Sequence, residues 1–139
     1  MTGGYQLTTA RVLRVYCPVA ADSLSALLAG DMAALERDPV LSNMLAVIRA
    51  HEALGDFGLY KAVMHLAPGW ELFTAGADAK PALGKAGAAA ISPTVLITIV
   101  LPEGNEEAVD RALAEIVAAH PWEVPVIEIG PTSLLRASA

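Results

Sequence analysis

The run of residues from Thr94 to Leu101 places the strongest constraint on the fold, because it is almost continuously apolar and rich in β-branched side chains. This pattern is typical of a β-strand that is covered on both of its faces. An amphipathic helix is predicted after it, over residues 105–119, where Asn105 can cap the helix and Pro121 stops it. The sequence therefore predicts a sheet with at least one helix beside it.

The remaining segments alternate between strand and helix patterns. Asp38 followed by Pro39 is the clearest helix start, because a carboxylate N-cap precedes a proline at the first helical position. Pro68-Gly69 fits the two central positions of a type II turn. In chain order we expect a frayed segment 1–9, a strand 11–16, a helical region 22–55 whose first helix is capped by Asp22 or Ser23, a strand 59–67, a returning strand or hairpin extension 70–74, a long mobile loop 75–93, the strand 94–101, the helix 105–119 and a strand 124–129.

This βαββαβ order predicts an α+β fold, the ferredoxin-like sandwich, as a single domain over residues 1–139 with its helices on one sheet face. The other sheet face then needs a cover, because Thr98 is the only polar residue within Val95–Leu101. Composition agrees with this: 55% of the residues are hydrophobic but only 5% are aromatic, so the apolar excess consists mostly of small side chains. We therefore expect a homo-oligomer.

Charge and composition argue against several classes of function. The net charge is −6, and 9 basic residues scattered singly along the chain do not form a nucleic-acid-binding patch. No apolar run approaches the roughly 20 residues of a membrane-spanning helix, and the N-terminal sequence lacks the pattern of an export signal. One cysteine, Cys17, allows no disulfide within the chain. A cytoplasmic protein without a nucleic-acid or membrane partner is the simplest interpretation.

The segment His120-Pro121-Trp122-Glu123-Val124-Pro125 is the motif most open to a functional interpretation. Two prolines make it a rigid turn that brings His120 and Glu123 close together. An imidazole and a carboxylate can bind a divalent metal, although two ligands are a weak signal. The structural alternative is a helix stop followed by an edge strand. Phosphate-binding glycine loops and common hydrolase motifs are absent, and Gly76, Gly84 and Gly87 are too widely spaced for a phosphate cradle.

Single residues outside this turn also have two interpretations. Cys17 suits a small core residue at the end of a strand, or a nucleophile if His120 approaches it in space. His51 suits the end of a helix and His65 a cross-strand contact. A small acid–base enzyme that uses His120 with Glu123 or Cys17 is thus an alternative function.

The segment from Ser92 to Ile129 resembles the C-terminal half of the divalent-cation tolerance proteins (CutA), in which an apolar strand, an acidic helix and an H-P-Y-E-V-P turn follow one another. Trp122 stands here in place of the tyrosine. The turn also resembles that of a domain inserted in dinuclear-metal hydrolase-like proteins, and this second likeness extends to Trp70, Gly76, Pro81, Gly84 and Gly87. Both groups share the fold of the trimeric nitrogen regulatory (GlnB-like) proteins. The helical region of this chain, residues 30–57, is longer than in either group.

The resemblance implies a non-enzymatic homotrimer with ligand sites in the clefts between its subunits and a signal-transduction role. Cys17, His120 and Glu123 would contact a divalent metal, copper or zinc. Loop 75–93 would contact a small ligand or a protein partner, and the implied ligand-binding residues are Lys80, Gly84, Lys85, Gly87 and Trp122. The alternative from another class is an adaptor module that assembles a larger complex through its apolar sheet face.

Overall fold

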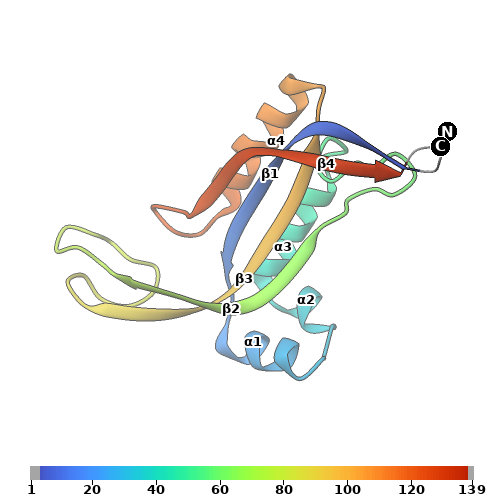
Figure 1. Ribbon diagram of the computed structural model, residues 1–139. Coiled ribbons are helices and arrows are strands. Elements are labelled where there is room, and N and C mark those ends of the chain that lie inside the picture. Colours follow the sequence, from blue (N-terminus) through green and yellow to red (C-terminus); the bar gives the residue numbers. More distant parts are fainter. Residues whose placement is uncertain (1–3, 138–139) are drawn as a thin grey trace.

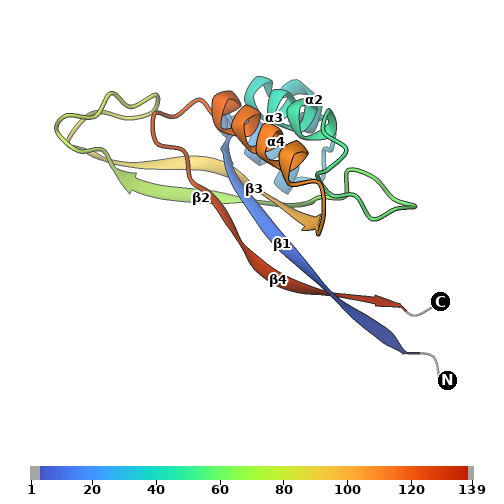
Figure 2. The ribbon, with the colours of Figure 1, turned by 90° about the horizontal axis from the view of Figure 1, so that it is seen from above.

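Four strands form one antiparallel sheet in the order β2-β3-β1-β4, and the helices lie on one side of it (Figures 1 and 2). The computed structural model describes residues 4–137. This arrangement is compatible with a ferredoxin-like α+β fold. The elements are β1 (Tyr5–Pro18), α1 (Ala21–Leu28), α2 (Ala34–Arg37), α3 (Pro39–Arg49), β2 (His65–Thr74), β3 (Ala89–Pro102), α4 (Glu106–Ala119) and β4 (Ile127–Ala137).

The core lies between the two central strands and the helices. Alternate residues of β1 and β3 are paired on the helix side of the sheet, for example Val15 with Ile97 and Leu13 with Ile99, and all four are fully or almost fully buried. The intervening residues, Leu96 and Val100 among them, are only half-buried in the single chain. The apolar run in β3 therefore divides into a buried row beneath the helices and a half-buried row on the opposite face.

The enlarged helical region is organised around one buried carboxylate. Asp38 caps α3 as predicted, since its Oδ1 accepts a hydrogen bond from the Leu41 N–H at 2.9 Å. Its Oδ2 accepts two more, from the Ala20 N–H at 2.9 Å and from the Ser23 hydroxyl at 2.7 Å. The predicted cap of α1 by Asp22 or Ser23 is therefore wrong: Ala20 occupies the N-cap, and Asp38 reaches it from 18 residues away.

Strands β1 and β4 are longer than the sequence suggests. Residues 5–9, expected to be frayed, belong to β1, while residues 1–3 lie outside the described residues. Strand β4 begins at Ile127 and continues to Ala137, well beyond the predicted end at Ile129. These extensions depend on each other, because β1 and β4 pair from Val15 with Ile127 out to Tyr5 with Ala137. Figure 2 shows the resulting two-stranded ribbon leading away from the helices.

The turn predicted at Pro68-Gly69 is also wrong, because both residues lie within β2, where Pro68 pairs with Val95. Strand β2 is an edge strand, and an edge tolerates a proline that lacks an N–H. Residues 59–64, expected to be strand, are irregular. The loop predicted over 75–93 is shorter in the structure, since residues 89–93 belong to β3. Strands β2 and β3 form a hairpin arm that projects at the opposite end from the β1–β4 ribbon (Figure 2).

Removal of the Asp38 carboxylate should destabilise the fold strongly. We expect Asp38→Ala to lower the free energy of unfolding by about 3 kcal/mol, because it removes a helix cap and leaves buried donors without an acceptor. Urea denaturation followed by circular dichroism measures this. Asp110→Ala, at an exposed position of α4, is the control and should change stability by less than about 0.5 kcal/mol. Equal effects of the two substitutions would contradict the role of Asp38.

Candidate functional site

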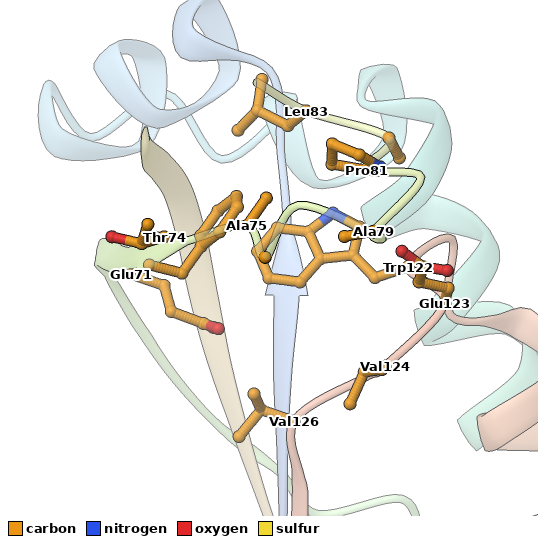
Figure 3. A pocket seen from close by; sticks show the side chains of 13 residues that line it. Glu71, Thr74, Ala75, Ala79, Pro81, Leu83, Trp122, Glu123, Val124 and Val126 are labelled. Carbon is orange, nitrogen blue, oxygen red and sulfur yellow. The ribbon is translucent and has the colours of Figure 1, made fainter. Parts of the chain in front are cut away.

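A pocket of about 280 Å³ lies between the outer end of the hairpin arm and the turn that follows α4. Its walls come from the end of β2, from the loop that follows, and from residues 122–126 before β4. Most of the lining is apolar, and two carboxylates belong to it. Figure 3 shows the Trp122 indole at the centre of the group. The lining residues are Glu71, Phe73, Thr74, Ala75, Gly76, Ala79, Pro81, Ala82, Leu83, Trp122, Glu123, Val124 and Val126.

His120 holds the turn that carries Trp122. Its Nε2 lies 2.8 Å from the Tyr16 carbonyl oxygen, and its Nδ1 accepts a hydrogen bond from the Trp122 N–H at 3.2 Å. A carbonyl can only accept, so Nε2 carries the proton and the ring is neutral. Burial lowers the pKa of His120, although the hydrogen bond to Tyr16 acts in the opposite direction. His120 is thus a positioning residue that ties the end of α4 to β1.

Aromatic packing then fixes the Trp122 side chain. Its ring centroid lies 5.1 Å from that of Phe73 on β2, in a tilted arrangement. The edge of the His120 ring adds a second contact at 5.7 Å. Both distances fall in the range of favourable aromatic pairs. The turn after α4 and the strand β2 are thereby joined across the pocket.

The loop that closes the pocket is held by backbone hydrogen bonds. Glu123 Oε1 accepts one from the Lys80 N–H at 2.7 Å, across 43 residues of sequence. At the base of the loop, the Gly87 N–H donates to the Ala75 carbonyl at 2.7 Å and the Ala75 N–H to the Ala88 carbonyl at 3.2 Å. Gly84 and Gly87 both have positive φ angles, +81° and +78°, which explains why glycine suits these positions. The loop thus has a defined path over the pocket.

The three residues expected to bind a metal are not assembled into one donor set. Cys17 is fully buried in the core, and burial, with a smaller effect of the Asp38 carboxylate, raises its pKa to about 12. Both ring nitrogens of His120 are already hydrogen-bonded, and Glu123 accepts from Lys80. Among residues 4–137 no cluster of three or more His, Cys, Asp or Glu could hold a metal ion. Metal binding stays a prediction that would need ligands from another chain.

The residues expected to bind a small ligand divide into two groups. Trp122 lines the pocket, and Lys80 adjoins it through the backbone bond to Glu123. Gly84, Lys85 and Gly87 are not part of its wall; they lie in the far half of the loop.

Two further lining residues, Glu71 and Phe73 on β2, were not predicted from the sequence. Alternation along β2 places both on one face of the strand. The predicted strand 70–74 already carried that signal, but nothing in the sequence indicated that this face meets the turn after α4.

The geometry offers little for acid–base or nucleophilic catalysis. A catalytic imidazole needs a nitrogen within hydrogen-bond reach of the substrate, and both His120 nitrogens are occupied within the chain. The Cys17 thiol faces the core and stays protonated near neutral pH, since its pKa is about 12. Neither His120 nor Cys17 is therefore placed to act on a molecule in the pocket.

Comparison with known proteins shows a likeness in fold. No family model and no curated protein matches the sequence. A solved structure described as a Bacillus cereus protein related to NIF3 is similar, with a TM-score of 0.58 and 13% sequence identity over 91% of this chain. The match covers 26% of that protein, so this chain spans about a quarter of its length. NIF3-related proteins are a different family from CutA, and the likeness extends to the fold alone.

Burial of a neutral His120 should make stability depend on pH. Its folded pKa lies below that of an unfolded histidine, so the unfolded state binds the proton more readily. We expect this contribution to be complete above about pH 6.5 and to be lost as the pH falls through the folded pKa. Urea denaturation of His120→Gln between pH 5 and 7.5 should show a weaker pH dependence than the unmutated chain. His65→Gln, on the exposed edge of the sheet, should retain it; an unchanged profile for His120→Gln would contradict the assignment.

Proposed function

We propose that this chain is a non-enzymatic, cytoplasmic signal-transduction module that binds a small ligand in the Trp122 pocket and transmits its state through the loop 75–88. The observation that carries the proposal is the pocket itself, which has aromatic residues in its wall and a loop held beside it by the bond from Lys80 to Glu123. Its volume of about 280 Å³ is near the lower limit of ordinary small-molecule sites. Its apolar lining with a few polar groups is also typical of such sites.

The loop supports a role in signalling because its closure depends on few contacts. Glu123 and the Lys80 N–H form the hydrogen bond that spans the pocket, while most other loop residues are exposed. A ligand that displaces Pro81 or Leu83 would move the loop without disturbing the core. A protein partner that contacts residues 75–88 could then distinguish the bound form from the free form.

A small organic ligand is favoured over copper or zinc as the molecule bound. A thiol with a pKa near 12 and an imidazole with both nitrogens bonded are poor metal ligands without rearrangement. A metal remains possible in the proposal only where a second chain supplies further donors at the cleft.

A homotrimer like those of the CutA and GlnB-like proteins is the assembly that the sequence resemblance supports. In the NIF3-related structure the matching part is 26% of that protein, so the same fold occurs there as one part of a longer chain. Both likenesses fit a module that works within a larger assembly, with the half-buried sheet face and the arms as contact surfaces.

Fragment binding at Trp122 tests the ligand site directly. The chain has 2 tryptophans, so Trp70→Phe leaves Trp122 as the single indole. We expect fragments of a mixed small-molecule library to shift the Trp122 indole N–H signal in NMR spectra, because this ring lines the pocket. The matched control is Trp122→Phe, in which the exposed Trp70 signal should stay in place with the same fragments. A library that leaves Trp122 unaffected would refute the proposed site.

A second candidate function, an adaptor that assembles a complex through apolar sheet surfaces, is favoured by the two arms. On the hairpin arm Leu72 and its partner Ile91 are 71% and 61% exposed. On the β1–β4 ribbon Leu7 and its partner Leu135 are 64% and 63% exposed. Paired leucine and isoleucine side chains at this exposure are typical of contact surfaces.

Light scattering tests the assembly. We expect a mass near three times 14.4 kDa, as in the homotrimer that the sequence resemblance supports. An isolated chain would leave both arms and the open sheet face in water. Leu72→Lys and Leu135→Lys should lower that mass, since a charge would then be buried in the contact. Glu107→Lys, at an exposed position on α4, serves as the control. A mass of 14.4 kDa for the unmutated chain would contradict the homotrimer.

A further inference from the structure

Glu71 is a carboxylate without a partner inside the apolar pocket. Its Oε1 is buried and has no hydrogen-bond partner in the part of the chain that the structure describes, residues 4–137. In Figure 3 the Glu71 carboxylate points into the space that Val124 and Val126 border on the other side. Buried polar atoms are rarely left unpaired in folded proteins, since each costs free energy. Such an atom at the wall of a pocket indicates a position where a bound molecule supplies the donor.

Burial also alters the Glu71 carboxyl group itself, because desolvation raises its pKa. Among residues 4–137 no basic side chain forms an ion pair with Glu71 that would relieve this. A cation that entered the pocket would offset the cost of keeping the Glu71 carboxylate ionised.

The other walls favour a cation with an apolar body. The rings of Trp122 and Phe73 lie against each other in the pocket wall, and the face of an aromatic ring attracts a positive charge. Val124, Val126 and Leu83 offer only apolar surface. Glu123 adds a second carboxylate, at the rim. An anionic ligand, such as a nucleotide with its phosphates, would meet two carboxylates here.

We infer that the ligand of this pocket is a small organic cation, an alkylamine with an aromatic or aliphatic body, whose ammonium donates a hydrogen bond to Glu71 while its apolar body packs against Trp122, Phe73 and the loop. The inference rests on the proposed function, to which it adds the chemical class of the ligand. A body of one ring on a short linker suits a volume of about 280 Å³.

Three matched probes test the inference: phenethylamine, 2-phenylethanol and 3-phenylpropionate, which carry a positive, a neutral and a negative group on the same phenylethyl body. Each is titrated at pH 7.5 into the Trp70→Phe chain while the Trp122 indole signal is followed by NMR. We expect phenethylamine to bind at least about tenfold more tightly than the alcohol, as a charge-assisted hydrogen bond allows. The acid should bind most weakly.

Glu71→Gln should remove this preference, because the amide has nearly the shape of the carboxylate without its charge. Glu107→Gln makes the same change in net charge at an exposed position on α4 and should leave all three affinities unchanged. The ranking of the three probes on the chain with Glu71 intact does not depend on how well the Glu71 variant folds.

Each other result overturns the inference. Equal affinity for the amine and the alcohol, tighter binding of the acid, or an amine preference that survives in Glu71→Gln would refute the cationic ligand. Binding of other fragments at Trp122 without phenethylamine would refute it too, while the ligand-binding function stands. If neither these probes nor the mixed library move the Trp122 signal, the proposed function fails with it.

Discussion

The pairing of β1 with β3 beneath the helices is the contact on which the remaining structure depends. It brings two rows of branched side chains together, and these rows account for much of the buried core. Because the helices lie on that side, no helix among residues 4–137 covers the opposite face of the sheet. The same pairing fixes where β1 and β3 leave the core. Each then continues with its outer neighbour, β1 with β4 and β3 with β2, as an arm beyond the helices.

The candidate site follows from how one helix ends. Helix α4 stops at His120, and the imidazole turns inward to the Tyr16 carbonyl instead of outward to water. This orientation of the imidazole positions the Trp122 backbone through its N–H, and the Trp122 ring then lies against Phe73. A residue that resembles a metal ligand in the sequence thus has a structural role. The charged side chains that line the pocket are those of Glu71 and Glu123.

Local signals predicted the helices well, whereas strand lengths depended on partners far away in the sequence. The caps at Asp38 and Asn105 were recognisable because each acts within three residues of its own position. The reach of Asp38 back to Ala20, and the pairing of Tyr5 with Ala137, join segments that no local pattern connects. The turn expected at Pro68-Gly69 had a sound local basis, but its dihedral preferences were overridden by pairing along the edge of β3. Glu71 was missed because no local pattern connects β2 with residues 122–126, which line the same pocket.

The hydrogen bond between Glu123 and residue 80 has a consequence for variation at this loop. The donor is a backbone N–H, so any amino acid other than proline could occupy position 80 and keep the bond. The length of the loop is under a stricter requirement than its composition. Deletion of one residue between Ala75 and Lys80 would bring Pro81, which has no N–H, opposite the carboxylate. Relatives of this chain should therefore differ freely in the side chain at this position while keeping the spacing from β2 unchanged.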